Sequence, residues 1–490
     1  MEYQSTRSAL RAEDTAAVLQ GIAPDGGLYI DPRLADRPFD WQACLPLAPL
    51  EMAERILSHL LPGYPDMGEL VRRAYDGKFD TDELTPLVPV GGDYVLELFH
   101  GPTAAFKDVA LSMLPQLITA GRSQAGVEDK IVILTATSGD TGKAALEGFH
   151  DVEDTGIIVF FPDDGVSPVQ KAQMVTQTGG NVRVCAVRGN FDDCQTGVKQ
   201  AFAAINQSGV LEGKGLRLSS ANSINIGRLA PQVVYYFIAY AELVKRGAVA
   251  CGDPVDYVVP TGNVGDILAG YFARLMGLPV GRLVCASNAN RVLTDFLNTG
   301  VYDKRREFLK TSSPSMDILV SSNLERLLFL ASDGDTALVS ACMRQLGEEG
   351  FYKMPAAAME KIRAVFSAGC CDEAETAETI GRVWRDYGYL CDTHTAVAFH
   401  VAEAYKRDNP AHAPVVVLST ASPFKFPAAV LRAVGGDTRG DEFEQMERLA
   451  ALSGLPIPRG LAGLREKEVL HKDVIDRGEI LSYVLEHLKG

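Results

Sequence analysis

The sequence predicts an α/β fold built on open, mostly parallel β-sheets that are divided between two domains. Three observations predict it: short, continuous apolar runs recur along the middle of the chain, helical patterns separate them, and several runs end in small or polar residues. Strands that are buried on both faces have this continuous apolar character, and the helices between them cover the sheet. Because such sheets bind ligands at the carboxyl ends of their strands, the loops that follow the strands are the candidate sites.

Six apolar runs are predicted to be buried strands, namely residues 131–134, 157–161, 182–187, 257–260, 283–286 and 415–418. The first, fourth and last of them lead into the loops TATSGDTG, PTGNVGD and STASP. Three other regions have a different character. The region up to about residue 98 has mixed helical patterns, residues 313–388 are predicted to be largely helical, and residues 439–490 are charged and helical.

Composition and charge disfavour several classes of partner. The 490 residues carry a formal net charge of −16, and such a field repels nucleic acid and anionic membranes. The sequence shows no apolar run of membrane-spanning length and no secretory signal, so we expect a cytoplasmic protein without a membrane partner. The nine cysteines lack CxxC spacing and the eight histidines lack HxxxH or HExxH spacing. We therefore expect reduced thiols and no dedicated metal site.

The block HGPTAAFKD places Lys107 at the start of a helical pattern over 108–120. The helix dipole disfavours a cation at this end, and desolvation by Phe106 lowers the pKa of the amine in the same direction. Both effects favour the neutral amine that imine formation requires. A surface lysine beside a helix is an equally good interpretation of this block taken alone.

The block TATSGDTGK, residues 135–143, joins a strand to a helix through hydroxyl groups and glycines. Backbone N–H groups at such a helix start bind anions. The spacing excludes a P-loop, because only two residues separate Gly139 from Gly142 and alanine follows the lysine. A carboxylate suits this short loop, and the alternative is an ordinary capped helix start with Asp140 as partner of the helix dipole.

Three further blocks carry polar groups between elements. PTGNVGD, residues 260–266, has two glycines that let the backbone surround a phosphate before a helix over 267–276. SANSINIGR, residues 220–228, ends in an arginine that could hold an anion before a helix over 229–243. STASPFKF, residues 419–426, offers a hydroxyl at a strand end. Each block taken alone is as well explained by a simple loop or helix cap.

Taken together and in this order, the five blocks closely resemble the threonine synthase family of fold-type II pyridoxal-5′-phosphate (PLP) enzymes. The family pattern is HGPT-x-AFKD, ATSGDTG, SANSIN-x-x-R, P-[ST]-GN-x-GD and T-A-x-P-x-KF, and the resemblance runs from about residue 3 to 430. It implies a fold like that of the tryptophan synthase β subunit, with the active site between two open α/β domains and PLP as cofactor. The chain departs from the family at Thr393, where proline is common, and at Ser422, where histidine is common.

The resemblance also implies a domain organisation. Residues 1–98 would form an N-terminal region, and 99–122 together with 222–430 a large PLP-binding domain with a helical insertion at about 313–388. Residues 123–221 would form a small α/β domain, and 431–490 a C-terminal helical extension. A monomer or a homodimer is expected.

The resemblance assigns roles to fourteen residues. Lys107 would carry PLP as a Schiff base and then move protons. The other cofactor-binding residues would be Gly262, Asn263, Val264, Gly265 and Asp266 around the PLP phosphate, Thr420 near the pyridine nitrogen and Asp140 near the phenolic oxygen. The substrate-binding residues would be Thr137, Ser138 and Thr141 for the carboxylate, and Asn222, Ser223 and Arg228 for the phosphate.

The implied activity is that of a carbon–oxygen lyase acting on phosphates. O-phospho-L-homoserine and water would give L-threonine and phosphate, the last step of threonine biosynthesis. The main alternative is a phospho-lyase that converts O-phosphohomoserine or O-phosphothreonine into 2-oxobutyrate. A serine/threonine dehydratase-like activity is disfavoured by the predicted phosphate clamp, and a non-catalytic binding protein is disfavoured by the retained Lys107.

Overall fold

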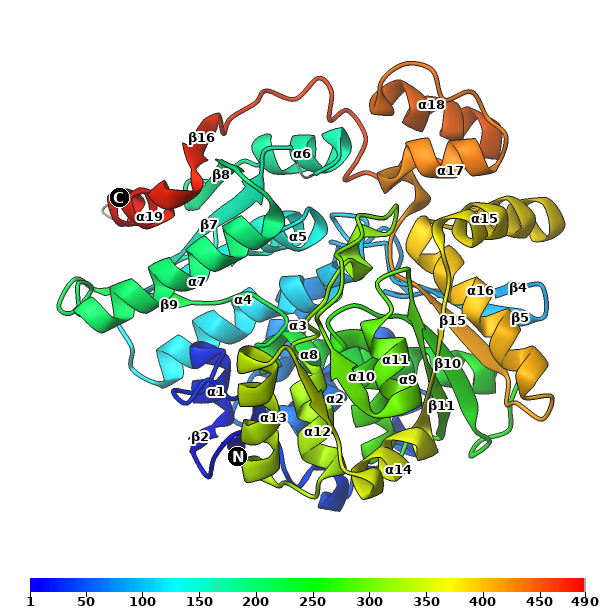
Figure 1. The fold of residues 1–490 in the computed structure, drawn as a ribbon, viewed down its shortest axis with the longest axis horizontal. Helices are drawn as coiled ribbons and strands as arrows, with labels where there is room; N and C mark the ends of the chain where they lie inside the picture. Colours follow the sequence, from blue (N-terminus) through cyan, green and yellow to red (C-terminus); the bar gives the residue numbers. More distant parts are fainter. Residues whose placement is uncertain (165, 489–490) are drawn as a thin grey trace.

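The computed structural model describes residues 1–164 and 166–488, and it contains two α/β units that lie side by side (Figure 1). Residue 165, within the predicted small domain, and residues 489–490, within the predicted C-terminal extension, lie outside the described residues. Each unit is built on its own parallel sheet, as the continuous apolar runs predict. No helix of the described residues is long and apolar enough to cross a membrane.

The large sheet has six strands in the order β14-β11-β10-β15-β5-β4, and only β4 runs antiparallel to its neighbour. Its strands are β4 (Leu87–Val90), β5 (Asp93–Glu97), β10 (Val255–Pro260), β11 (Val280–Ser287), β14 (Phe366–Cys370) and β15 (Val415–Ser419). Helices α10 (Gly265–Leu275), α11 (Val292–Thr299) and α16 (Thr393–Asp408) pack against it. Because β4 and β5 belong to this sheet, it reaches back into the region that was predicted to end at residue 98.

The small sheet has five parallel strands in the order β16-β8-β7-β6-β9. They are β6 (Lys130–Ala136), β7 (Thr155–Pro162), β8 (Val182–Arg188), β9 (Leu216–Ser219) and β16 (Asp473–Asp476). Helices α5 (Asp140–Phe149), α6 (Pro168–Val175) and α7 (Phe191–Ser208) belong to the same unit. The long helix α4 (Lys107–Gln124) is buried along most of its length and packs on α5, which joins the two units.

The predicted C-terminal helical extension, residues 431–490, contains a strand as well as helices. After α17 (Pro427–Ala433) and α18 (Glu442–Ser453), the chain runs across to the small unit and adds β16 beside β8 before α19 (Ile480–His487), as Figure 1 shows in orange and red. Ile480 and Val484 on α19 are buried in the core of the small unit. Four residues are too few to show strand periodicity, so only the pairing partner reveals this strand.

Two predicted helical segments are interrupted. The helix predicted over 229–243 is divided into α8 (Ile226–Leu229), a 3₁₀ turn and α9 (Val233–Lys245), because Pro231 has no N–H to continue an α-helix. The segment 313–388 contains helices but also two strands, one of which is β14 at the edge of the large sheet. Its other elements are α12 (Leu324–Ala331), α13 (Thr336–Glu348), β13 (Phe351–Lys353), which pairs with β12 (Val301–Asp303), α14 (Ala356–Val365) and α15 (Glu373–Tyr387).

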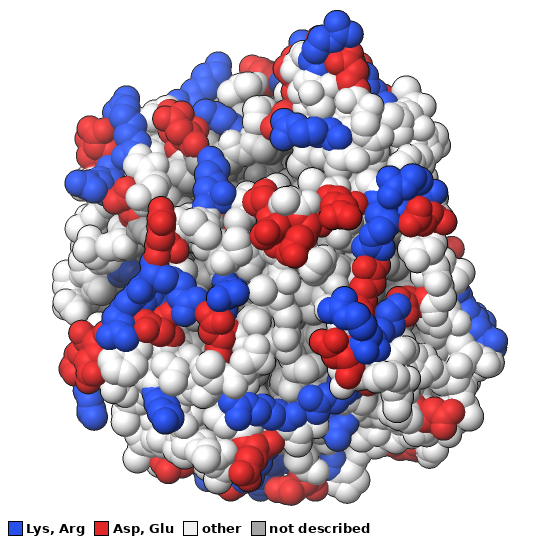
Figure 2. Space-filling model, turned by 45° about the vertical axis from the view of Figure 1, so that its right-hand side comes forward, with Lys and Arg blue, Asp and Glu red and all other residues white. Residues whose placement is uncertain are grey.

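The N-terminal region packs against both α4 and the large unit. It contains the small sheet of β1 (Glu2–Ser5), β2 (Arg11–Glu13) and β3 (Tyr29–Ile30), and the helices α1 (Asp14–Gln20), α2 (Pro49–Leu60) and α3 (Met67–Tyr75). Arg7 forms an ion pair with Glu325 on α12 at 2.8 Å, which ties this region to the large unit. On the face of the molecule in Figure 2, basic and acidic side chains are interspersed rather than segregated.

Candidate active site

A cavity of about 630 Å³ lies where loops of the two units meet. It is lined from the small unit by the loop between β6 and α5, and from the large unit by the loops after β10 and β15 and by the start of α4. All fourteen residues that the sequence singled out line this one cavity. The structure thus brings together groups that lie as far apart in the chain as Lys107 and Thr420.

Lys107 is the first residue of α4 and is almost completely buried at the cavity wall. Its Nζ donates a hydrogen bond to Ser315 Oγ at 3.2 Å, and it lies 3.9 Å from Asp140 Oδ2 and 4.6 Å from the centre of the Phe106 ring. Burial lowers the pKa of the Lys107 amine to about 8, although the Asp140 carboxylate opposes this shift. The amine is therefore neutral far more often near pH 7 than that of a solvated lysine.

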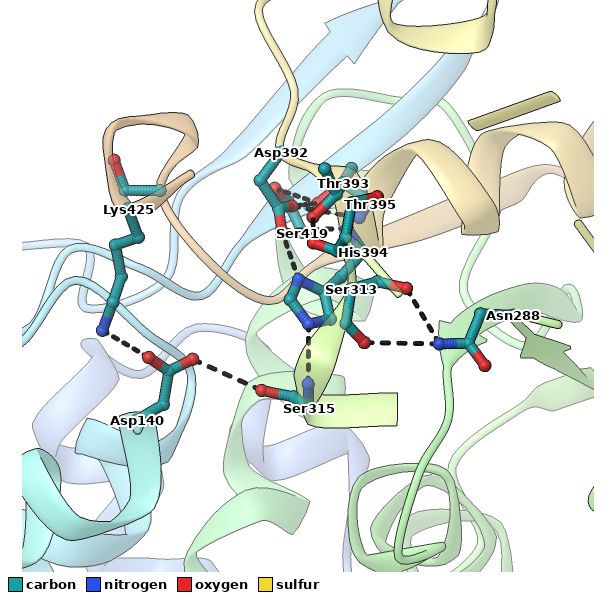
Figure 3. A network of polar contacts seen from close by, with 12 residues as sticks. Asp140, Asn288, Ser313, Ser315, Asp392, Thr393, His394, Thr395, Ser419 and Lys425 are labelled. Atoms are coloured by element: carbon teal, nitrogen blue, oxygen red, sulfur yellow. Dashed lines mark hydrogen bonds and ion pairs between the residues drawn. The ribbon is translucent and has the colours of Figure 1, made fainter. Parts of the chain in front are cut away.

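Asp140 lies at the start of α5, where Lys425 and Ser315 contact its carboxylate (Figure 3) and Lys107 lies 3.9 Å away. Its Oδ1 accepts a hydrogen bond from Gln170 Nε2 at 2.9 Å and lies 2.8 Å from Nζ of the fully buried Lys425, which also donates to Thr103 O. Burial alone would raise the pKa of Asp140, but Lys425 and Lys107 hold it below its ordinary value. The carboxylate therefore remains ionised beside Lys107.

The loop that leads into α5 is organised by the buried hydroxyl of Thr137. Thr137 Oγ1 accepts hydrogen bonds from the N–H groups of Gly139 at 3.0 Å and Gly142 at 2.9 Å. Gly139 has φ of 140° and packs so closely on Gln170 that a Cβ would lie 2.5 Å from its side chain. Thr137 therefore shapes the loop, while Ser138 and Thr141 line the cavity with partly exposed side chains.

The loop after β10 forms a close-fitting turn at the start of α10. Val264 has a left-handed backbone conformation with φ of 64°, and a Cβ on Gly262 would lie 2.5 Å from Ser315 O. The first N–H groups of α10 have no partner within the helix and suit an anion such as a phosphate. Residues 262–266 therefore fit the phosphate of a cofactor through their backbone.

The Asp266 side chain is held by two tyrosine hydroxyl groups. Its Oδ1 accepts hydrogen bonds from the hydroxyl groups of Tyr235 at 2.5 Å and Tyr236 at 3.1 Å. Burial raises the pKa of Asp266 to about 7, although the two tyrosine hydroxyls oppose the shift. At neutral pH this carboxyl group is therefore only partly ionised, and the backbone of Asp266 is the part that suits the predicted cradle.

Arg228 supplies a buried cation at another side of the cavity. It lies on α8, its Nη1 donates to Ala221 O, and its Nε has no hydrogen-bond partner within the described part of the chain. Burial lowers the pKa of Arg228 to about 10, so the guanidinium stays charged at neutral pH. Asn222 and Ser223 line the same side.

Several lining residues were missed by the sequence motifs. Ser315 belongs to a 3₁₀ turn within the segment predicted to be largely helical, and its Oγ lies 3.3 Å from Asp140 Oδ2. Lys199 on α7 and Lys304 after β12 add two cations to the cavity wall. None of these residues stands in a recognisable block, so no signal in the sequence could have identified them.

A buried Asp–His pair supports the Ser315 turn (Figure 3). Asp392 Oδ2 lies 2.6 Å from His394 Nδ1, and the N–H of Ser315 donates to His394 Nε2 at 3.1 Å. Because Nε2 accepts this bond, the proton of a neutral imidazole must lie on Nδ1 and be donated to Asp392. Hydrogen bonds thus connect Asp392, His394, Ser315 and Lys107.

The two positions at which the chain departs from the family pattern shape loops. Thr393 Oγ1 donates to Ser312 O at 2.7 Å, and Ser422 Oγ accepts from the N–H of Phe424 at 3.3 Å. Thr420, by contrast, is buried at the end of β15 and lines the cavity.

Away from the cavity, Cys371, Glu375 and His400 place potential ligand atoms within 4.8 Å of one another. Histidine spacing could not have shown this group, because its members come together only through the packing of α15 on α16. Burial raises the pKa of the Cys371 thiol to about 12. The thiol is therefore protonated in the absence of a metal ion.

The fold and the cavity together define a class of protein. Two open parallel sheets meet at a buried lysine of lowered pKa, with a glycine-containing helix start for a phosphate and a hydroxyl group at a strand end opposite. This is a PLP-dependent enzyme of fold type II. A family model described as "Pyridoxal-phosphate dependent enzyme" matches residues 84–421, and one described as "Threonine synthase, C-terminal" matches residues 395–475.

Similar proteins define the family more closely. Threonine synthase of Pseudomonas aeruginosa is 40% identical over 470 residues, which cover 92% of this chain and 96% of that protein. The PLP-bound threonine synthase structure from Brucella melitensis has a TM-score of 0.87 at 38% identity, with 100% of both chains covered. The yeast threonine synthase structure has a TM-score of 0.85 at 33% identity, with 99% of this chain and 98% of that chain covered.

The chain belongs to the threonine synthase family. The fold class, the family and the cofactor class predicted from the sequence are thereby confirmed. Threonine synthase-like 1 of Macaca fascicularis is also 40% identical, over 436 residues that cover 85% of this chain. The aligned region is 57% of that protein, so the chain spans little more than half the length of these relatives.

Proposed function

We propose that this protein converts O-phospho-L-homoserine and water into L-threonine and phosphate. The observation that carries the proposal is the meeting, in one cavity, of an amine of lowered pKa with two positions that suit an anion. One position is the start of α5, with Ser138 and Thr141, and the other is Arg228. A substrate with a carboxylate at one end and a phosphate at the other needs this arrangement.

The substrate would be held at its two charged ends. The N–H groups at the start of α5 and the hydroxyl groups of Ser138 and Thr141 would bind the carboxylate. Arg228, with Asn222 and Ser223, would bind the phosphate through charge-assisted hydrogen bonds. Lys199 and Lys304 strengthen the positive potential of the cavity and favour a substrate whose phosphate carries two charges.

The cofactor residues fit PLP. Lys107 would hold it covalently, the backbone of residues 262–266 would bind its phosphate, and the Thr420 hydroxyl would face its ring nitrogen. When bound, PLP supplies an electron sink for negative charge that develops on the substrate carbon atoms. Asp140 remains an ionised carboxylate beside Lys107 and would hold the cofactor's phenolic oxygen region in place.

Lys107 would carry the proton transfers. Its neutral amine would take the proton from Cα of the substrate, a proton removed from Cβ would be returned to Cγ after phosphate has left, and Cα would regain its proton at the end. Water would add its hydroxyl to Cβ and its remaining proton would leave with the phosphate, which completes the exchange of phosphate for hydroxyl. Ser315 Oγ, which accepts a hydrogen bond from Lys107, fixes the direction of the amine, and the Asp392–His394 pair fixes Ser315.

The test is a product assay on the holoenzyme with O-phospho-L-homoserine. We expect threonine and phosphate in equal amounts, and a Lys107→Ala variant that makes neither. Release of phosphate with 2-oxobutyrate and no threonine would overturn the proposal in favour of a phospho-lyase, which would use the same lysine and clamp. Similarity does not separate these outcomes, since the threonine synthase and the threonine synthase-like 1 relatives are both 40% identical to the chain.

A further inference from the structure

A second cavity, of about 470 Å³, is separate from the active cavity, because no described residue lines both. Its walls come from four parts of the chain: the turn after α3, Pro102 with Ser112 of α4, helix α5 with the residues that follow it, and the segment 459–467 between α18 and β16. We propose that this second cavity binds a small molecule carrying two or more negative charges, phosphate or carboxylate.

The charge of the lining carries the proposal. Four cations line the cavity, namely Lys78, Lys143, Arg459 and Lys467, whereas Glu147 is its only acidic lining residue. The chain as a whole has a formal net charge of −16, so this concentration of positive charge opposes the global balance. Like charges that share a partly desolvated cavity repel one another, and an anion bound among them relieves that repulsion.

Glu147 is already neutralised by one of the cations. Lys143 Nζ lies 2.9 Å from Glu147 Oε2 and also donates to Gln177 Oε1. Burial lowers the pKa of Lys143, and Glu147 opposes this shift. Burial alone would raise the pKa of Glu147, but Lys143 lowers it. This pair leaves Lys78, Arg459 and Lys467 to attract a ligand.

The three remaining cations have few acidic partners. Arg459 Nε forms an ion pair with Asp80 Oδ1 at 3.5 Å in which both side chains are exposed, and its Nη2 donates to Lys78 O at 3.0 Å. Lys78 and Lys467 form no ion pair within the described residues. Burial lowers the pKa of Lys78, because desolvation disfavours its charged form. A bound anion would stabilise that charged form. His150 also lines the cavity and pairs with Asp151 at 3.1 Å.

The wall formed by the C-terminal segment is held closely against the protein. A Cβ on Gly460 would lie 1.9 Å from Pro102 O, so only glycine allows this approach. Gln173 Nε2 donates to Gly460 O at 3.5 Å, which links the same point to α6. The backbone beside Arg459 is therefore held in place at this wall of the cavity.

The size of the cavity limits the ligand. A volume of about 470 Å³ is within the range of small-molecule sites and too small for a macromolecule. Ser112 and the His150 ring add polar groups that can accept or donate hydrogen bonds to phosphate or carboxylate oxygens. A compact polyanion is the ligand that these dimensions and charges fit.

The experiment uses the holoenzyme and two probes, inorganic pyrophosphate and citrate, in calorimetric titrations at low ionic strength. The test variant is Arg459→Ala/Lys467→Ala. The matched control is Lys214→Ala/Lys353→Ala, which removes two exposed cations away from both cavities. We expect the test variant to bind the better probe at least about tenfold more weakly than the wild type and the control, since each lost charge-assisted contact contributes to affinity.

Hydrogen–deuterium exchange locates the binding. Pyrophosphate or citrate should protect the turn around residues 77–78 and the segment 459–467 in the wild type but not in the test variant. Protection confined to residues 137–141 and 222–228 would place the anion in the active cavity and overturn the proposal. Equal affinity of the test variant and the wild type, or no binding of either probe, would also overturn it.

The two probes distinguish phosphate from carboxylate ligands. Tighter binding of pyrophosphate would indicate a phosphate ligand, and tighter binding of citrate a carboxylate ligand. The outcome is independent of the proposed catalytic activity. A protein that makes 2-oxobutyrate instead of threonine can still bind an anion at Lys467, and a threonine-forming enzyme can fail to do so.

Discussion

Replacing Asp140 by asparagine should shift the pH at which Lys107 reacts with PLP. In the wild type, burial brings the pKa of Lys107 to about 8. About one-tenth of the amine is then neutral at pH 7, compared with about one in 3,000 for a lysine at the ordinary value of 10.5. Cofactor incorporation should therefore rise with pH and level off above about 8.

The size of the shift follows from the distance between the two charges. At 3.9 Å and an effective dielectric constant of about 20, the attraction between Lys107 and Asp140 is about 4 kcal/mol. This corresponds to about three pKa units, and we expect between about one and three, because Lys425 shares the carboxylate. The pKa of Lys107 should fall in Asp140→Asn, because removing the negative charge destabilises the protonated amine.

The assay mixes apoprotein with PLP at pH values on both sides of 8 and follows the visible absorbance of the Lys107 adduct. A small amine treated in parallel corrects for titration of PLP itself. The control is Asp163→Asn, which removes a carboxylate paired with Lys171 at 2.7 Å outside the cavity. A midpoint in Asp140→Asn that stays with the control, or moves upward, would refute the reasoning.

Three further predictions concern the surroundings of Lys107. Lys425→Met should lower the free energy of unfolding by about 3–5 kcal/mol in chemical denaturation, because it leaves buried Asp140 without its closest cation; a loss below about 1 kcal/mol would contradict this. Arg228→Ala should raise KM for the phosphorylated substrate at least about tenfold while PLP content is unchanged, and loss of PLP instead would assign Arg228 to the cofactor. His394→Phe should lower kcat by about ten- to a hundredfold through misplacement of Ser315, with KM within about twofold; an equal effect on KM would indicate general disruption.

Local patterns in the sequence predicted much of the fold. The six apolar runs all lie in strands of the two parallel sheets, because burial on both faces demands apolar residues at successive positions. The split between α8 and α9 could also have been read from Pro231, since the loss of a backbone N–H is a local property. The strands β14 and β16 could not be predicted from the sequence, because such short strands are defined by the strand with which they pair.

The blocks of the candidate site were recognisable for a similar reason. Loops at strand ends contain glycines and hydroxyl groups next to helix starts, and these residues form recognisable sequence motifs such as ATSGDTG. The resemblance then ordered the blocks into one site, and all fourteen residues line one cavity. The contacts of each side chain within the cavity could not be predicted from local sequence. Asp266, for example, accepts hydrogen bonds from Tyr235 and Tyr236.

The sequence by itself determined the class of sheet, the family and the position of Lys107 at a helix start. Only the tertiary structure decided the electrostatic surroundings of that lysine, because charge interactions depend on distance and burial rather than on spacing along the chain. Lys425 lies 2.8 Å from Asp140 although 285 positions separate them (425 minus 140), and Lys467 meets Lys143 at the second cavity in the same way. No local pattern contains such pairs, so they become visible only when the chain is folded.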